Sequence, residues 1–282
     1  MGEELEAIIF KTFDIPPMPE VATKIVRAAD NVKVSANELA EIINSDPGLV
    51  TKTLRIANSA LFSPTKKIDS LQQAVVALGF KTVKNLAIAA SARILSRTPG
   101  PIEAALWQHS IGAAVAGGCI AARDKRVSGD EAFTAGLLHD VGKFILHTHN
   151  QDKFKKALEL RKKRGMTSVA AEFEAYGFDH TAVGAAVLRR WNLPEALVGA
   201  VRFHENISIL RSAKDEVLRL AAATNLANRV TYTLKLGVDI PYEDTGDTQE
   251  AAVKILGLSP KDLLWIVEDT KRLYDDELKA LS

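Results

Sequence analysis

The stretch Gly136-Leu137-Leu138-His139-Asp140-Val141-Gly142-Lys143 places an imidazole and a carboxylate side by side within an apolar segment. The apolar residues around this pair predict that it lies inside a helix running from Asp130 to about His149. A neutral imidazole and a carboxylate can bind one divalent cation, with further ligands supplied by neighbouring helices. A buried His–Asp pair can also simply hydrogen-bond helices together, because leaving it unpaired would be costly. The spacing alone leaves both interpretations open.

The remaining histidines extend this candidate site. All six histidines fall between positions 109 and 204, and three lie on separate predicted helices or helix ends: His109, His180 and His204. Ligands from four helices have the form of a metal site in the core of a helical bundle. His147 and His149 lie near a predicted helix end, where they suit the negative end of the helix dipole. His147 follows Lys143 by four residues and could share its face.

The composition is that of a globular protein. The chain has 282 residues, for which two domains or one large domain are expected. Hydrophobic residues make up 47% and charged residues 25%, which excludes wholesale disorder and collagen-like repeats. The net charge is +1, so no overall basic excess indicates nucleic-acid binding. Alanine is common and aromatic residues are only 6%, which favours closely packed helices.

Helix-capping residues divide the chain. Ser35, Asp46-Pro47 and Ser70 each begin a predicted helix, and Gly79 ends the short helix that Ser70 starts. The strongest break is Thr98-Pro99-Gly100-Pro101, and longer helices follow it. We therefore predict an all-α protein of two helical subdomains, residues 1–98 and 99–236, with a helical C-terminal extension at 237–282. The nearest approach to a strand, at 238–242, is short and contains a proline.

Targeting features are not evident in the sequence. Cys119 is the single cysteine, so no disulfide framework or thiolate metal cluster can form within the chain. The first ten residues are acidic and do not resemble a signal peptide. The most apolar run, 104–122, is interrupted by polar residues and fits a buried helix better than a membrane span. A cytoplasmic location with no membrane association is expected.

Several separated motifs resemble the HDOD family, whose fold is of the HD type. The C-terminal motifs are WQHS at 107–110, AFTAGLLHDVGK at 132–143 and GFDHTAVGAAVLRRWNLPEALVGAVRFHE at 177–205. The N-terminal motifs are IPPMPEVATKIV at 15–26, ELAEIINSDPGLVTKTLRIANSALF at 38–62 and IDSLQQAVVALGFKTVKNLAI at 68–88. The match covers roughly residues 14 to 235. It implies that the second subdomain is an HD-type helical bundle.

The resemblance also implies a metal site. In related HD-superfamily phosphohydrolases, a His, an adjacent His-Asp and a later Asp bind a metal that activates water. The matching positions here are His109, His139 and Asp140, with His180 and His204 where some members carry further histidines. Lys143 matches the lysine that follows the His-Asp pair, and is the one possible catalytic residue. The later Asp has no counterpart: Thr224, followed by Asn225, aligns best with its place.

These departures favour a regulatory protein over an enzyme. The Ile-Pro and Gly-Tyr-Pro motifs of the cyclic-di-GMP phosphodiesterase branch are absent, and HDOD proteins are in general regarded as signalling modules. We expect a degenerate HD-type site that can hold a divalent metal ion. The protein is expected to bind a protein partner or small ligand through the groove between its subdomains. The alternative is a metal-dependent phosphohydrolase acting on a nucleotide or other phosphate ester.

Direct DNA binding is not favoured. Four basic residues lie on two neighbouring predicted helices: Lys52, Arg55, Lys81 and Lys84. A helix-turn-helix would present such residues to a groove, but a solvated charged face is the commoner arrangement. The densest basic run, 155–164, is interpreted as the exposed face of one helix and a candidate patch for an anion or partner.

Overall fold

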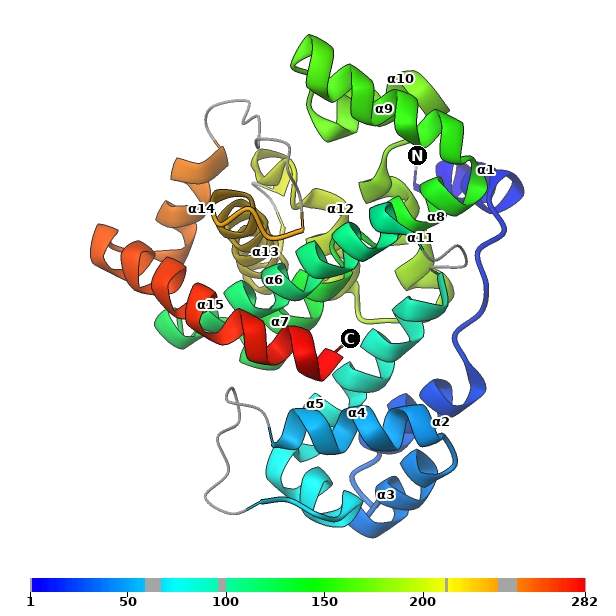
Figure 1. The fold of residues 1–282 in the computed structure, drawn as a ribbon, viewed down its shortest axis with the longest axis vertical. Coiled ribbons are helices and arrows are strands. Elements are labelled where there is room, and N and C mark those ends of the chain that lie inside the picture. The colour runs from blue at the N-terminus through cyan, green and yellow to red at the C-terminus, as the bar shows by residue number, and fades with distance from the viewer. Residues whose placement is uncertain (1, 59–66, 96–99, 211–212, 238–247, 282) are drawn as a thin grey trace. The chain divides into compact units, whose positions relative to one another are not determined.

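The chain is all-α in the computed structural model, which describes residues 2–58, 67–95, 100–210, 213–237 and 248–281 (Figure 1). Helices make up most of these ranges, and no strand occurs in them, which confirms the predicted fold class. The strand-like segment 238–242 and the first two residues of the predicted break, Thr98 and Pro99, lie outside the described residues.

The helices follow one another in three groups along the chain. The first group is α1 (Gly2–Thr12), α2 (Glu20–Ala29), α3 (Ala36–Asn44), α4 (Pro47–Ala57), α5 (Leu71–Ala92) and the 3-10 turn η1 (Arg93–Leu95). The middle group is α6 (Pro101–Arg123), α7 (Gly129–Leu138), α8 (Val141–His149), α9 (Gln151–Arg164), α10 (Ser168–Tyr176), α11 (His180–Arg190) and α12 (Glu195–Phe203). The chain continues with η2 (Ile207–Leu210), α13 (Asp215–Thr233), α14 (Thr248–Leu256) and α15 (Pro260–Leu281).

The chain forms two compact units. Unit 1 comprises residues 1–17 and 95–270, and unit 2 comprises 18–94 and 271–282. The domain bounds 1–98, 99–236 and 237–282 stay a prediction. In unit 1, α1 packs on α11, and the Trp191 indole donates a hydrogen bond to the Pro16 carbonyl. In unit 2, Arg55 donates to the Lys279 carbonyl, so the last residues group with this unit.

Unit 2 is built from short helices with side-chain caps. Ser35 and Glu38 form the predicted capping box, and Asp46 accepts hydrogen bonds from two backbone amides at the start of α4. Gly79 has φ +77° and ψ 161°, so it interrupts α5 as the sequence predicts. The helices bury a core of aliphatic side chains that includes Ile25, Leu39, Ile43, Ile56 and Ile88.

One segment among the described residues is long and apolar enough to cross a membrane, judged by length and composition. It is Leu71–Leu95, with a mean hydropathy of 1.3 over its best window, of which 56% is buried within the protein. Val75, Leu86 and Ile88 of this segment are almost completely buried. The segment therefore has the character of a core helix of unit 2.

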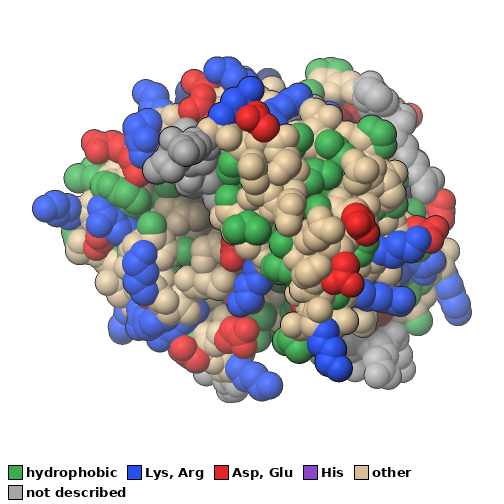
Figure 2. Space-filling model, turned by 90° about the horizontal axis from the view of Figure 1, so that it is seen from below, with side chains coloured by type: hydrophobic (Ala, Val, Ile, Leu, Met, Phe, Trp, Pro, Cys, Tyr) green, Lys and Arg blue, Asp and Glu red, His purple; other side chains and the backbone are tan. Residues whose placement is uncertain are grey.

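The basic residues considered for nucleic-acid contact are partly engaged inside unit 2. Lys84 is paired with Asp30 at 2.7 Å, and Arg55 bonds a backbone carbonyl. Burial lowers the pKa of Lys52, which is not a freely solvated cation. On the face drawn in Figure 2, Lys and Arg side chains are interspersed with Asp and Glu, in keeping with the net charge of +1.

Unit 1 holds the long, alanine-rich helices. α6 packs along α7 and α13, while α11 packs on α8 and α12. The approach of α7 to α6 depends on Gly136, because a Cβ there would lie 2.3 Å from the Ala113 carbonyl oxygen. Close helix packing of this kind places the polar side chains of four helices within reach of one another.

The predicted helix from 130 to 149 is wrong in one important respect, because it is two helices. α7 ends at Leu138 and α8 begins at Val141, with Asp140 at φ −100° and ψ 13° between them. In a continuous helix, adjacent residues diverge by about 100°, so His139 and Asp140 could not face the same point. The break allows both side chains to turn into the interior of unit 1.

Candidate metal centre

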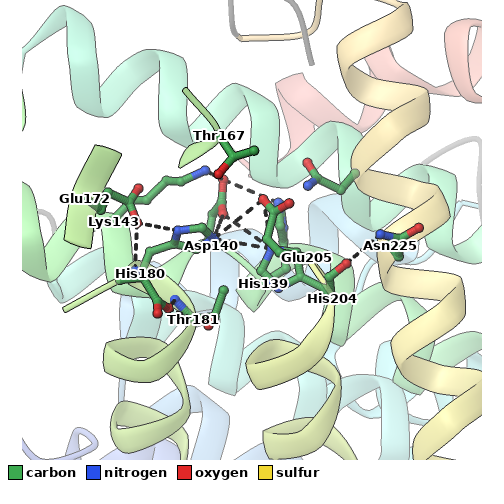
Figure 3. A network of polar contacts seen from close by, with 12 residues as sticks. His139, Asp140, Lys143, Thr167, Glu172, His180, Thr181, His204, Glu205 and Asn225 are labelled. Atoms are coloured by element: carbon green, nitrogen blue, oxygen red, sulfur yellow. Dashed lines mark hydrogen bonds and ion pairs between the residues drawn. The ribbon is translucent and has the colours of Figure 1, made fainter. Parts of the chain in front are cut away.

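The structure brings together all five residues that the sequence selects as metal ligands (Figure 3). His109 lies on α6, His139 and Asp140 lie between α7 and α8, His180 begins α11, and His204 follows α12. Each is at most 1% exposed. Two groups of ligand atoms have all members within 4.8 Å of one another, and Asp140 belongs to both. That these residues ligate a metal stays a prediction.

Asp140 is the centre of this cluster. Its Oδ2 lies 3.4 Å from His139 Nε2 and 3.8 Å from His109 Nε2. Its Oδ1 lies 3.3 Å from His180 Nε2 and 3.9 Å from His204 Nε2. Among the described residues, Oδ1 has no hydrogen-bond partner. The carboxylate therefore offers one oxygen to each side of the cluster.

Lys143 neutralises one oxygen of this carboxylate. Its Nζ donates to Asp140 Oδ2 at 2.7 Å, one turn along the chain. Burial alone would lower the pKa of Lys143, but the Asp140 carboxylate raises it above its ordinary value. Burial would likewise raise the pKa of Asp140, yet His139 and Lys143 hold it well below the ordinary value. The two groups form a buried ion pair.

The close approach of α8 to α11 sets the position of Asp140. A Cβ at Gly142 would lie 2.0 Å from the His180 carbonyl oxygen and 2.8 Å from the Gly184 nitrogen. Glycine at this position lets the two helix backbones touch beside the cluster. This contact explains why Asp140 reaches His180, which is distant in sequence.

Three imidazoles turn the same nitrogen toward the cluster. The Nδ1 of His139 donates to the Gly136 carbonyl at 2.7 Å, and that of His204 donates to the Val201 carbonyl at 2.8 Å. The Nδ1 of His180 lies 2.6 Å from Glu172 Oε2, which also accepts the His180 backbone amide. With the proton on Nδ1, each neutral ring carries a lone pair on Nε2.

The donor set fits a divalent cation. The Nε2 atoms of His180 and His204 lie near Asp140 Oδ1, and that of His139 lies near Asp140 Oδ2. His139 Nε2 and Asp140 Oδ1 have no hydrogen-bond partner among the described residues. His180 Nε2 and His204 Nε2 are only 3.4 Å apart. Ligating histidines characteristically donate their other ring nitrogen to a carbonyl or carboxylate, as all three do here. Converging acceptors without donors are electrostatically unfavourable until a cation joins them.

His109 differs from the other three histidines. Its Nδ1 lies 3.2 Å from the Leu236 carbonyl, and its Nε2 lies 2.8 Å from the Asn228 side-chain amide. Burial lowers the pKa of His109 to about 4, so the ring is neutral near pH 7 and carries one N–H. Both contacts are satisfied when the Asn228 amide is turned to donate from Nδ2. The ligand nitrogen of His109 is then already engaged.

Thr224, which the family resemblance aligns with the lost carboxylate, does not meet His109. Thr224 donates to the Leu220 carbonyl of its own helix, and Asn225 donates to the His204 carbonyl at 2.6 Å. The α13 side chain that meets His109 is Asn228. Asn228 follows Thr224 by four residues on the same helix face, which is the signal that could have identified it.

Two acidic residues near the cluster were also missed by sequence reasoning. Glu172 on α10 holds His180 in place through its Oε2. Glu205 Oε1 lies 3.8 Å from His180 Nε2 and 3.7 Å from His204 Nε2. Burial would raise the pKa of Glu205, but His204, His180 and Lys143 lower it, so the side chain is ionised.

The pKa values of two histidines of the cluster are shifted in opposite directions. Burial lowers the pKa of His204 to about 3, which keeps it neutral and able to bind a cation. Burial acts the same way on His180, but the Glu172 carboxylate outweighs it and raises the pKa above the ordinary value. A divalent cation would displace the proton that Glu172 favours on His180.

The two remaining histidines lie elsewhere in unit 1. His147 Nδ1 lies 3.0 Å from Glu103 Oε1, and the two side chains join α8 to α6. His149 packs edge-on against Phe13 of the segment that follows α1. Neither takes part in the cluster around Asp140.

A family comparison covers the part of the chain that contains the cluster. The family model of the HDOD domain matches residues 15–207, more than half of the chain. The chain belongs to the HDOD family. All five candidate ligands lie within the residues that match this HDOD domain, whereas Asn228 lies beyond them.

Solved structures share the HDOD fold. An HDOD domain protein of unknown function from Geobacter sulfurreducens has a TM-score of 0.79 and 22% identity, over 98% of this chain and 96% of that one. A "Putative signal transduction protein" from Marinobacter aquaeolei VT8 has a TM-score of 0.76 and 20% identity, over 99% of this chain and 65% of that one. A "Putative phosphohydrolase" from Shewanella amazonensis SB2B has a TM-score of 0.73 and 21% identity, over 98% of both chains. At these identities the likeness shows the fold alone.

A curated sequence relative is longer than this chain. An uncharacterized protein of Treponema pallidum (strain Nichols) is 29% identical over 236 residues, which are 82% of this chain. The chain spans 44% of that protein's length.

Proposed function

We propose that this HDOD protein is a regulatory, signal-transducing protein whose buried cluster around Asp140 holds a divalent metal ion, and that it acts by binding a protein partner or small ligand. The observation that carries this proposal is that the α13 side chain that meets His109 is an amide, Asn228, and that the neighbouring Thr224 and Asn225 carry no carboxylate either. The cluster keeps cation-binding chemistry while lacking one of the charges that catalysis uses.

The metal would be held by side chains of the cluster itself. His180 and His204 offer their Nε2 atoms, and Asp140 offers Oδ1. Bound there, the ion would supply a positive charge that ties α8, α11 and α12 together. Since such a site exists only in the folded chain, cation binding would stabilise that state.

The surroundings of the cluster support a structural or regulatory ion over a catalytic one. A catalytic metal needs an open position for water and substrate. Here each of the five candidate ligands is at most 1% exposed. Lys143 is the single candidate for a catalytic group, and its ammonium is already paired with Asp140 at 2.7 Å.

A metal-dependent phosphohydrolase is the second candidate function. It is favoured by one observation, which is that three imidazoles, a carboxylate and a buried lysine lie together. A metal-activated water and a cation beside it would suit attack on a phosphate ester. The name of the Shewanella amazonensis protein with the same fold is consistent with this candidate.

A turnover assay separates the two functions. The protein, loaded in turn with Zn²⁺, Mn²⁺ and Mg²⁺, is incubated with cyclic-di-GMP, common nucleotides and p-nitrophenyl phosphate. We expect no hydrolysis near the typical enzymatic rate of about 10 s⁻¹. Turnover near that value that is abolished in Asp140→Ala would replace the regulatory function with the hydrolase.

A stability assay tests the metal binding that this proposal includes. The midpoint of thermal unfolding is compared for the chelator-treated protein with and without added Zn²⁺. We expect a rise that grows with the concentration of free metal, because the ion binds only the folded state. An unchanged midpoint at saturating Zn²⁺ would remove the proposed metal site.

A further inference from the structure

We propose that the cation occupies one side of the cluster only, held by Asp140, His180, His204 and Glu205, and that Glu205 supplies the carboxylate that α13 lacks. This inference rests on the proposed metal-binding function and specifies its ligands. It adds a residue outside the expected HD ligand set and assigns His109 a different role. Figure 3 shows the Glu205 side chain beside Asp140 and the two histidines.

Each of the two carboxylates lies near both imidazole nitrogens, at spacings close to those between ligands of a single small cation. The Nε2 atoms of His180 and His204 are 3.4 Å apart, and Asp140 Oδ1 lies 3.3 Å and 3.9 Å from them. Glu205 Oε1 lies 3.8 Å and 3.7 Å from the same two nitrogens. Tetrahedral ligands at 2.0–2.1 Å from Zn²⁺ are separated by about 3.3–3.4 Å. A contraction of a few tenths of an ångström would complete this geometry.

The charge on this side also suits a divalent ion. Asp140 and Glu205 are two carboxylates, and the two imidazoles can bind in their neutral form. The His204 ring is held by the Val201 carbonyl and the His180 ring by Glu172. Both rings are therefore oriented in advance, with Nε2 directed at the two carboxylates.

The opposite side of the cluster is already occupied by protein groups. Asp140 Oδ2 accepts the Lys143 ammonium, whose charge would repel a cation at this oxygen. The Nδ1 of His109 contacts the Leu236 carbonyl, and its Nε2 contacts the Asn228 side-chain amide. Of the possible ligand atoms on this side, His139 Nε2 alone has no hydrogen-bond partner among the described residues. One free nitrogen does not make a metal site.

The donor set defines a class of metal. Two imidazole nitrogens and two carboxylate oxygens suit borderline divalent ions of the first transition row, Zn²⁺ among them. Mg²⁺ and Ca²⁺ prefer sites made of oxygen alone. The site is therefore expected to bind Zn²⁺ more tightly than Mg²⁺.

The experiment measures Zn²⁺ affinity by competition with a chromophoric chelator, using the full chain stripped of metal. Glu205→Gln keeps the shape of the side chain and removes its charge. We expect its affinity to fall by more than about 100-fold, because losing even an outer-shell partner costs about 10–100-fold. The matched variant is His109→Gln, which should bind Zn²⁺ within a few-fold of the wild type.

The outcomes are distinguishable from one another. If the wild type binds no Zn²⁺, the proposed function fails, and this inference fails with it. If the wild type binds but His109→Gln loses affinity while Glu205→Gln keeps it, the ion lies on the other side and only this inference is overturned. Circular dichroism on each variant establishes folding before titration. Glu205→Asp, which restores the charge on a shorter arm, should recover part of the lost affinity, whereas no recovery would contradict ligation by this carboxylate.

Discussion

Unit 1 contains two buried assemblies of histidine and carboxylate, and they differ in how completely they are satisfied. Glu103 and His147 form a pair at 3.0 Å between α6 and α8, one acceptor facing one ring nitrogen. The cluster around Asp140 gathers four imidazoles and leaves His139 Nε2 and Asp140 Oδ1 without hydrogen-bond partners among the described residues. The Glu103–His147 pair is thus closed, in the sense that its acceptor faces a ring nitrogen. The cluster around Asp140 is open, because it has more acceptors than donors.

This difference is the ground on which we infer that the cluster around Asp140, and not the Glu103–His147 pair, binds a ligand. Burial does not separate them, because both assemblies are almost completely inaccessible to solvent. Balance of donors and acceptors does, since a buried lone pair without a partner costs about 1–3 kcal/mol. An excess on several side chains at one point indicates a ligand that supplies positive charge.

The largest expected effect comes from removing the carboxylate at the centre of the open assembly. Asp140→Ala should lower the free energy of unfolding by about 3–5 kcal/mol, because it leaves the buried Lys143 ammonium without its counter-charge. Denaturant unfolding of the chelated protein measures this loss. The double variant Asp140→Ala with Lys143→Met should recover much of it, and equal loss in both variants would contradict the ion-pair account.

A second variant tests the backbone contact that brings Asp140 to His180. Gly142→Ala places a Cβ 2.0 Å from the His180 carbonyl oxygen, so α8 and α11 must separate. We expect a loss of about 3 kcal/mol in unfolding free energy, together with weaker Zn²⁺ binding. The control is Gly118→Ala, where a Cβ meets nothing within 4 Å. Similar stability of the two variants would show that the contact is not tight.

The dependence of stability on pH gives a third test on the metal-free protein. His109 has a pKa of about 4 in the folded chain, against 6.5 ordinarily, so unfolding takes up a proton between these values. Its contribution is complete above pH 6.5 and is lost toward pH 4, with a slope of about 1.4 kcal/mol per pH unit. His204 acts in the same direction, whereas His180, with its raised pKa, acts oppositely.

Urea unfolding at several pH values between 4 and 7, with chelator present, measures this slope. His109→Gln should reduce the slope by about 1.4 kcal/mol per pH unit, which corresponds to one proton taken up on unfolding. An unchanged slope in this variant would show that His109 is not held neutral by its burial.

The smallest effect is expected at the closed assembly. Glu103→Gln keeps an oxygen acceptor for His147 and removes only the charge, so the unfolding free energy should fall by about 1 kcal/mol. Zn²⁺ affinity, measured by the same competition titration, should be unchanged. A marked loss of affinity would mean that the two assemblies are coupled and that their comparison fails.

Much of the fold was predictable because local signals agreed with the tertiary structure. Ser35, Asp46 and Ser70 cap helices where the sequence indicates, and Gly79 interrupts α5. The break at Asp140 was not predicted, because the apolar residues around it continue a helical pattern, although Asp140 is a residue type that commonly begins a helix. Packing against α11 determines it, and that contact joins residues far apart in the chain.

The site was predictable to the extent that its residues are chemically distinctive. Histidines and the His-Asp pair stand out in an alanine-rich sequence, and the structure brings them together. Glu172, Glu205 and Asn228 do not stand out, since acidic and amide residues are common on helix surfaces. Their roles follow from which helices meet, and a single sequence does not contain that information.

The most direct test of the account is the metal content of purified protein, measured by elemental analysis on wild type, Asp140→Ala and Glu103→Gln. The account predicts that wild type and Glu103→Gln each hold about one divalent ion per chain after loading with Zn²⁺ and desalting, and that Asp140→Ala holds none. Equal metal content in all three proteins would contradict it, because the ion would then have no connection with the cluster around Asp140.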